Sequence, residues 1–586
     1  MFNREYRLIW KLFFSSLSVF FLSTLTSTLG SLVDGVVIGN TMNTNSVAAY
    51  GLVTPLSFAF ALIGSVLNSG SQNACAGALG RGDKEEAQKI FSLTCASGFG
   101  VSLVVMLAIL LLSRPIVGAL GAEPGTELFA DTRAYLIGYA LGLPAITGTK
   151  LLSSIMQLDS DRRRALTSVV TMTGVNVIGD LLCVYVLNGG LAGIALITSL
   201  SYYAGLGVLL LHFTGKNIIF RLSFSNLRWK DLGDIVRLGM PKGVSRVTSL
   251  FYGVFLNRIL VSVSATAVAG YSVQASFNYL ANAVVMGIAQ SMMLLTAIYH
   301  GEENRDALRR VVRVSFWAEL ILTGSLAVLV YFFAPQITRL YLGSNLDAHA
   351  DGSLSLRWYA AGLLFQGFNI LFADYLQSTR RIQPANLVYI LENVVFTVLA
   401  VTWLSGTDSS EHVYRGVAAA HLLMFLSIPV FVMIRNRRPL RHLDDFLMLN
   451  KDFGVSPEDQ IAVTITSMEE VISLSKQLWN FCRKKGLDER RTYLTSLAAE
   501  EMAGNIVVHG FSDGKRHNLV VRVICKNGEM VLTLRDDCRP FDPKERFQYL
   551  DSDDPAANIG LRMIMRIARE VSYSSAMKMN NLIIRI

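Results

Sequence analysis

The chain has 586 residues, of which 52% are hydrophobic and 17% are charged, and its formal net charge is +9. One hydrophobic core rarely fills so long a chain, so we expect at least two domains. The Lys and Arg residues stand in short clusters between long apolar runs, so we expect a lipid bilayer and no nucleic acid as partner. The six cysteines have no metal-ligand or redox spacing and imply no disulfide framework.

Apolar segments long enough to cross a membrane, at about twenty residues each, follow one another through most of the chain. They predict about twelve helices, near residues 12–38, 47–73, 90–112, 131–157, 163–187, 190–213, 235–263, 267–297, 311–334, 354–378, 384–404 and 413–434. Cations gather in alternate connections, such as Arg162-Arg163-Arg164 and Arg380-Arg381, and the positive-inside rule then places both termini in the cytoplasm. The first apolar run is too long for a cleavable signal peptide. We therefore expect a multi-pass protein of the cell membrane.

The two halves of this region share short motifs in the same order. Val47-Ala-Ala-Tyr50 returns as Val268-Ala-Gly-Tyr271 at the second span of each half, and Gly190-Leu-Ala-Gly-Ile194 returns as Gly416-Val-Ala-Ala-Ala420 at the sixth. Six helices are an even number, so the halves are parallel repeats, which place a substrate cavity at their interface. We expect a first lobe over residues 1–215, a second over 216–440, a linker over 441–459 and a soluble domain over 460–586.

Polar residues inside the predicted spans are candidates for a cation site. Asp34 lies late in the first span, Asn176 and Asp180 lie one turn apart on the fifth, and Thr198 lies early in the sixth. The two acids and Thr198 fall roughly 8–12 Å from the outer end of their spans. A charge at a helix centre costs about 2.5–3.5 kcal/mol and needs compensation. Oxygen ligands suit Na⁺, crowded carboxylates suit a proton, and a structural polar cluster explains the same placement.

Other charges within the spans lie mostly in the second half. Glu319, Asp374 and Glu392 either line the substrate cavity or form ion-paired structural contacts. Lys150 lies roughly 15 Å deeper than Asp180, and we expect it to extend toward the cytoplasmic face.

Two of these segments carry a family resemblance. The Leu32–Gly39 segment before Val47-Ala-Ala-Tyr50, and Asn176-x-x-x-Asp180 before the stretch from Gly190 to Thr198, resemble the multidrug and toxic compound extrusion (MATE) family over about residues 10–435. The resemblance implies an antiporter that exports organic cations and other small-molecule drugs in exchange for Na⁺ or H⁺. It assigns the coupling cation to Asp34, Asn176, Asp180 and Thr198. The chain departs from some members in the seventh span, where residues 244–256 carry Arg246 and no carboxylate, with Arg258 beyond.

The last part of the chain has the pattern of a soluble α+β domain. We expect a strand near 460–466, helices near 468–484 and 489–509, strands near 519–525 and 530–535, a helix near 558–570 and two closing strands. Asn527-Gly528 between the middle strands is a hairpin signal. Glu501, Asn505 and His509 recur every four residues and share one helix face. That face either activates water and holds Mg²⁺ or is merely solvated.

The spacing downstream of that helix resembles the GHKL ATPase fold, and most of all its anti-sigma-factor serine kinase branch, over about residues 460–586. The resemblance rests on Glu501-x-x-x-Asn505, on Asp536-Asp-Cys538 after a strand, and on Asn558-Ile-Gly560 at a helix start. It implies that ATP and Mg²⁺ bind here, with Glu501 as general base, Asn505 as Mg²⁺ ligand, Asp536 on the adenine amine and Gly560 at the phosphates. Cys538 and Ala557-Asn558 stand where that family has glycine.

Together these patterns predict a polytopic α-helical membrane protein with a GHKL-like tail. The favoured hypothesis is a cation-coupled multidrug exporter regulated by ATP, whose tail meets a cytosolic regulatory protein. Whether the tail has weak ATPase or serine/threonine kinase activity is left open. The alternatives are a membrane-tethered anti-sigma-type kinase with the helices as sensor, and a lipid-linked-precursor flippase.

Overall fold

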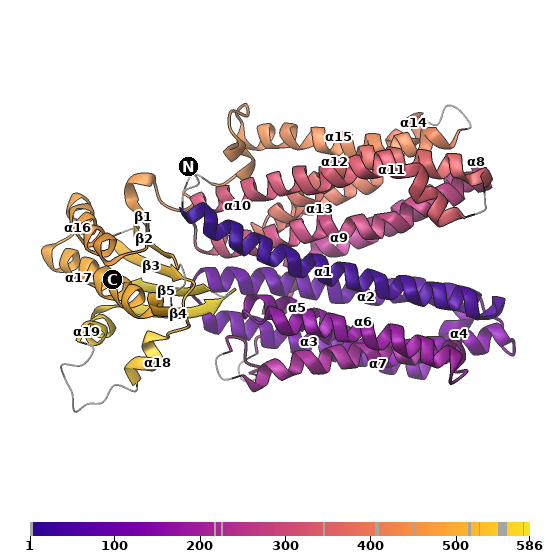
Figure 1. Cartoon of the computed structure of the whole chain (residues 1–586), viewed down its shortest axis with the longest axis horizontal. Coiled ribbons are helices and arrows are strands. Elements are labelled where there is room, and N and C mark those ends of the chain that lie inside the picture. The colour runs from indigo at the N-terminus through magenta and orange to yellow at the C-terminus, as the bar shows by residue number, and fades with distance from the viewer. Residues whose placement is uncertain are drawn as a thin grey trace.

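The computed structural model describes residues 4–215, 218–223, 227–343, 346–404, 409–450, 452–513, 517–526, 528–548, 559–577 and 579–586. Two bundles of long helices lie side by side, and a smaller sheet domain stands at one end of both (Figure 1). We call that end of the bundles the tail side and the opposite end the far side. The sheet domain, residues 456–586, is called the tail.

The first bundle contains seven helices and one 3₁₀ turn: α1 (Arg4–Thr41), α2 (Thr44–Gly80), α3 (Lys84–Ala119), α4 (Glu127–Leu141), α5 (Leu143–Leu158), α6 (Arg162–Tyr185), α7 (Gly190–Leu210) and η1 (Leu211–Thr214). The second contains eight: α8 (Asp231–Val263), α9 (Ala265–Gly301), α10 (Arg305–Ala318), α11 (Gly324–Leu342), α12 (His349–Ser378), α13 (Ile382–Ile390), α14 (Thr397–Leu404) and α15 (Ser410–Asn436). The π-helical segments Glu319–Thr323 and Leu391–Phe396 join α10 to α11 and α13 to α14.

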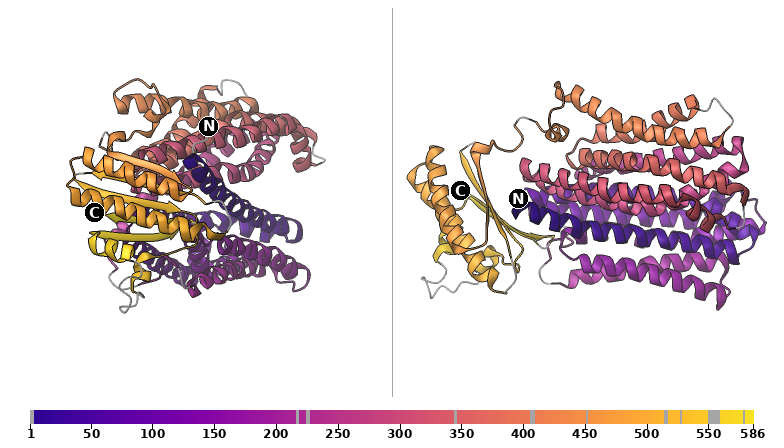
Figure 2. Two further views of the ribbon diagram at one scale, coloured as in Figure 1. Left: turned by 60° about the vertical axis from the view of Figure 1, so that its left-hand side comes forward. Right: turned by 45° about the horizontal axis from the view of Figure 1, so that its top comes forward.

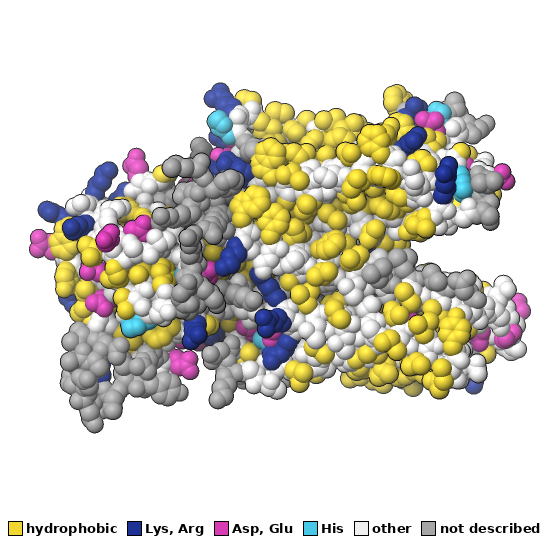
Figure 3. Space-filling view, in the orientation of Figure 1, with side chains coloured by type: hydrophobic (Ala, Val, Ile, Leu, Met, Phe, Trp, Pro, Cys, Tyr) yellow, Lys and Arg dark blue, Asp and Glu magenta, His cyan; other side chains and the backbone are white. Residues whose placement is uncertain are grey.

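Within the described residues, 10 helices are long and apolar enough to cross a membrane. The predicted span near 131–157 is instead two shorter helices, α4 and α5, which meet at Gly142. The span near 354–378 is α12, which is also outside those 10. Hydrophobic side chains cover much of the visible outer surface of both bundles, as a bilayer requires (Figure 3).

The bundles touch through glycines near the tail side. Gly80 and Gly301 bring α2 against α9, and Gly70 and Gly239 bring α2 against α8. A Cβ atom added at any of these four positions would collide with a backbone carbonyl oxygen of the opposite helix. Small residues allow helices to approach this closely. On the far side the bundles diverge and leave a hollow between them (Figure 3).

The tail is an antiparallel sheet in the order β1-β2-β3-β5-β4. Its strands are β1 (Gln460–Ile465), β2 (Leu519–Lys526), β3 (Glu529–Asp536), β4 (Glu570–Ala576) and β5 (Met579–Arg585). Its helices are α16 (Met468–Lys484), α17 (Glu489–Asn505), α18 (Pro543–Gln548) and α19 (Ile559–Ile567), and a π turn, Ile506–Gly510, extends α17. The long helices lie on one side of the sheet and the bundles on the other (Figure 2).

Strand alternation explains this layering. Val521 and Leu534 are buried with the helices of the tail, whereas their neighbours Arg522 and Arg535 contact the second bundle. The predicted order of strands and long helices is confirmed. The last helix ends at Ile567, and Glu570, predicted as helical, begins β4. Asn527 and Asn558 lie outside the described residues.

Candidate functional site

The first candidate site is buried between α1 and α6. Asp34 comes from α1, and Asn176 and Asp180 come from α6. All three are buried, and Asp34 lies within electrostatic and hydrogen-bonding range of the other two. Gly30, one turn before Asp34, lies against the Asn176 amide, because a Cβ there would lie 3.4 Å from Asn176 Oδ1. The structure thus brings these three predicted residues together.

Three carboxylate oxygens of this site lack donors. Among the described residues, Asp34 Oδ1 and both Asp180 oxygens have no hydrogen-bond donor. A buried carboxylate without a donor is expensive, more so inside a bilayer. Oxygen atoms arranged in this way fit a small hard cation or a proton.

Thr198 lies on α7, which packs against α6. Its hydroxyl is buried and donates to the Ile194 carbonyl oxygen at 3.0 Å. The hydroxyl oxygen keeps its lone pairs for a ligand, but the bond that the structure gives it lies within its own helix.

Two tyrosines near the acids were missed at the sequence level. The rings of Tyr50 and Tyr135 meet edge to face with centroids 5.6 Å apart, and both lie within electrostatic range of Asp34. Tyr50 had a signal, because it closes a motif that recurs in the second half. From the sequence alone, that motif indicates only the internal repeat.

Of the three acids in the second half, two have partners. Lys242 donates to Asp374 at 2.6 Å, and Tyr389 also donates to it at 3.1 Å. Glu392 Oε1 lies 2.8 Å from His421 Nδ1 and 2.8 Å from Asn369 Nδ2. These contacts favour the structural interpretation for both acids.

Glu319 differs from them. Both of its oxygens are buried without a hydrogen-bond partner among the described residues. It occupies space left by Gly367, where a Cβ would collide with the carboxylate.

The second candidate site is in the tail. Glu501 lies on α17 and Gly560 at the start of α19. A Cβ atom at Gly560 would collide with the Glu501 carboxylate, so the two residues are in direct contact. Asn505, one turn further along α17, is exposed. The predicted base therefore stands against the predicted phosphate turn.

Asp536 ends β3, where it is buried. Its Oδ1 accepts hydrogen bonds from Asn580 Nδ2 at 2.7 Å and from the Cys538 amide at 2.9 Å. Burial raises the pKa of Asp536, although these hydrogen bonds oppose the shift. Asn580 was missed by the sequence, because only the pairing of β3 with β5 places it opposite Asp536.

The Cys538 substitution is accommodated locally. Its sulfur packs on Gly510, where a Cβ would lie only 2.8 Å away. A buried carboxylate, a base beside a glycine and an exposed amide fit an adenine amine, a phosphate and Mg²⁺ respectively. Residues 551–558, which include the substituted glycine turn, lie outside the described residues.

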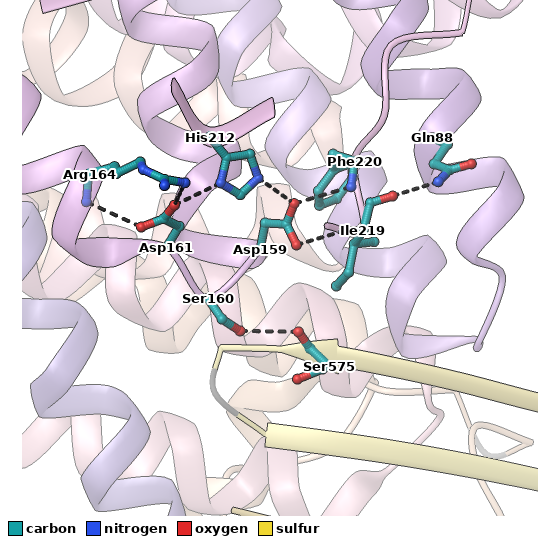
Figure 4. Close-up of polar contacts among 9 residues, drawn as sticks. All are labelled: Gln88, Asp159, Ser160, Asp161, Arg164, His212, Ile219, Phe220 and Ser575. Carbon is teal, nitrogen blue, oxygen red and sulfur yellow. Dashed lines mark hydrogen bonds and ion pairs between the residues drawn. The ribbon is translucent and has the colours of Figure 1, made fainter. Parts of the chain in front are cut away.

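The tail also contacts the first bundle (Figure 4). The loop Asp159–Asp161 is held by His212, whose Nε2 lies 2.8 Å from Asp159 and whose Nδ1 lies 2.8 Å from Asp161. Burial alone would raise the pKa of Asp161, but hydrogen bonds with His212 and the Arg164 amide lower it. Ser160, at the tip of this loop, donates to the Ser575 carbonyl oxygen at 3.1 Å.

Ion pairs join the tail to the second bundle. Arg535 of β3 pairs with Glu302, and Lys526 of β2 pairs with Glu303. The Arg535 guanidinium also lies over the ring of Tyr299, 5.1 Å from its centroid. Burial alone would lower the pKa of Arg535, but the neighbouring Glu302 carboxylate raises it.

Between these contacts lies the β4–β5 turn. The Met577 amide donates to the Leu158 carbonyl oxygen at 3.1 Å. Met577 and Met579 are buried in the same hydrophobic cluster as Leu12 and Leu79. The tail thus contacts both bundles on the side where glycines bring them together.

Comparison with known proteins agrees with this arrangement. The MatE family matches residues 20–182 and 241–402, and the histidine kinase-like ATPase domain matches residues 466–586. The multidrug export protein MepA of Staphylococcus aureus is 21% identical over 426 residues, covering 70% of this chain and 94% of that protein. The Staphylococcus haemolyticus protein of the same name is 20% identical over 431 residues, covering 72% and 94%.

Solved structures share the helical fold. A MATE structure in the bent conformation has a TM-score of 0.67 at 20% identity, covering 73% of this chain and 95% of that one. The Vibrio cholerae MATE transporter VcmN in its bent form has a TM-score of 0.67 at 18% identity, covering 72% and 96%.

Proposed function

This chain belongs to the MatE family, and from that premise we propose that it exports small organic molecules across the cell membrane in exchange for Na⁺ or H⁺. We propose further that its tail lies in the cytoplasm, binds ATP with Mg²⁺ and regulates transport. Organic cations and drugs are the substrates that the family resemblance implies.

The observation that carries the proposal is the Asp34–Asp180 pair with Asn176. Two buried carboxylates at one level of a bundle repel each other unless a cation or a proton joins them. Binding of that cation changes the charge between α1 and α6. A site whose charge depends on the ion gradient can bias the packing of these helices, which is the coupling that an antiporter needs.

Transport in proteoliposomes tests this site. Asp34→Asn and Asp180→Asn should each abolish export driven by imposed Na⁺ or H⁺ gradients while the protein still inserts and purifies as a single species. Glu123→Gln, an exposed acid between α3 and α4, is the control and should retain transport. Full export by both site variants would remove the coupling role.

The regulatory part is supported by three consecutive residues. Arg535 pairs with Glu302 of the second bundle, Asp536 lies in the nucleotide site, and Asp537 accepts from Lys11 of α1 at 2.7 Å. A nucleotide that moves Asp536 therefore acts on neighbours that bind both bundles. Protease digestion of vesicles of known orientation tests the sidedness, and an extracytoplasmic tail would overturn regulation by ATP.

A second candidate function is that of a membrane-tethered serine/threonine kinase. It is favoured by the contact of Glu501 with Gly560, which keeps a base beside the phosphate turn. Phosphotransfer to a cytosolic protein partner that is lost in Glu501→Gln would support it.

A further inference from the structure

Two cations from opposite bundles lie near each other just beyond the point where the bundles meet. α2 and α8 cross at Gly70 and Gly239. Arg246 lies about 10 Å along α8 from Gly239, toward the far side. Lys150 of α5 lies beside Gly64 of α2, with its Cδ 3.8 Å from a Cβ built there, and Gly64 is about 9 Å from Gly70 in the same direction. Lys150 and Arg246 are within electrostatic range of each other.

Neither of these cations is paired with an acid among the described residues. In the part of the chain that the structure describes, no ion pair or hydrogen bond is found for either side chain. Lys242 lies one turn before Arg246 on the same face of α8, and it is paired with Asp374. Among the described residues, Lys242 therefore has a carboxylate partner and Arg246 has none.

Both side chains are accessible. Arg246 is exposed and Lys150 is partly exposed. The space between the bundles opens to the far side (Figure 3), and both residues lie on that side of the crossing between α2 and α8. Tyr279 and Tyr389 lie within electrostatic range of Arg246, and the exposed Tyr279 adds aromatic surface beside it.

We infer that the space between the bundles binds an organic anion, with a carboxylate or phosphate head group between Lys150 and Arg246 and an apolar body against Tyr279. This rests on the proposed export function, in which that space is the transport cavity, and it replaces organic cations with organic anions as the preferred substrates. Like charges close to each other repel, and one anion between them relieves both. Because the two cations come from different bundles, the bound anion also draws the bundles together.

Binding to the full chain in nanodiscs of phosphatidylcholine tests the charge of the ligand. Fluorescein, an anion, and a cationic rhodamine share the same three-ring body and differ mainly in charge. Wild type should prefer fluorescein. Arg246→Gln and Lys150→Gln should each weaken fluorescein binding about tenfold or more and leave rhodamine unchanged or tighter. Arg246→Glu should reverse the preference, and Arg258→Gln, an exposed site on the same helix, should not alter it.

A second arm separates the two sources of such an anion. Phosphatidate added to the nanodiscs should displace fluorescein if a lipid head group is the natural ligand, whereas a soluble organic anion leaves fluorescein binding insensitive to that lipid. Either result supports an anion site. A wild type that prefers rhodamine, or an Arg246→Gln variant with an unchanged preference, would overturn it.

The outcome can be told apart from failure of the export function. Binding is measured without an ion gradient, so it reports on the anion site and not on coupled export. Gradient-driven export of rhodamine but not fluorescein would leave the exporter standing and remove the anion site. Anion binding without any gradient-driven export would support the anion site and remove the exporter function.

Discussion

At the scale of single residues, the tail site was predictable where its members share a helix and unpredictable where strands bring them together. Helical spacing places Glu501 and Asn505 on one face of α17, and the family resemblance implies their roles. Asn580 follows only from the register in which it faces Asp536, a long-range pairing that no local pattern encodes. Its hydrogen bond to Asp536 fixes the orientation of that carboxylate.

A first prediction separates binding from chemistry in this site. Asp536→Ala should weaken ATP binding to the full chain about tenfold or more, because it removes the acceptor for the adenine amine. Glu501→Gln should leave binding largely intact and remove hydrolysis or phosphotransfer, because a general base acts in the chemical step. Calorimetric titration and phosphate release measure the two effects. Equal ATP affinity in wild type and Asp536→Ala would place the nucleotide elsewhere.

A second prediction concerns pH. Burial raises the pKa of Asp536 in the folded tail above its unfolded value, so the ionised form opposes folding as pH rises through the folded pKa. Asp536→Asn should therefore raise the thermal stability of the tail at neutral pH. That difference should shrink as pH falls through the raised pKa, where the wild-type carboxyl is protonated. Glu489→Gln, an exposed acid on α17, should show no such trend.

At the scale of elements, periodicity predicted the strands and long helices well. Val521, Val523, Leu532 and Leu534 alternate with outward residues, as a half-buried sheet requires. The division at Gly142 was missed because the apolar run continues across it. The helix α18 is short and polar, so it has no periodicity to detect.

The glycine crossings lead to a third prediction. Gly80→Ala should push α9 away from α2, because its Cβ would collide with the Ile298 carbonyl oxygen. The tail side should then open and the far side should close, which spin-label distances between the bundles can measure. Gly100→Ala on α3, where nothing lies within 4 Å of the added atom, is the matched control. Unchanged distances in Gly80→Ala would mean that this crossing does not hold the bundles.

At the scale of the whole molecule, the docking of the tail onto both bundles had no sequence signal. Glu302 and Arg535 are far apart in the chain, and a lone charge in a turn usually means solvent exposure. Glu302 and Arg535 are instead largely buried and form an ion pair, and the neighbouring Asp537 accepts a hydrogen bond from Lys11 of α1. These contacts make an interface between the tail and both bundles. The tail thus contacts both bundles where they must separate if the tail side is to open.

The last prediction tests whether this interface transmits the state of the nucleotide site. Arg535→Glu places like charges against Glu302 and leaves Asp536 in place, so ATP should still bind while the response of transport to ATP is lost. Glu302→Arg combined with Arg535→Glu restores opposite charges and should recover the response, as a double-mutant cycle requires. Lys485→Glu, which breaks a pair with Asp459 within the tail, is the control for a general loss of charge balance.

If the tail is a sensor, Glu501→Gln should keep the ATP response, because binding alone shifts the bundles. Loss of the response in Glu501→Gln, with Arg535→Glu unaffected, would instead assign control to turnover and favour the kinase or ATPase alternative.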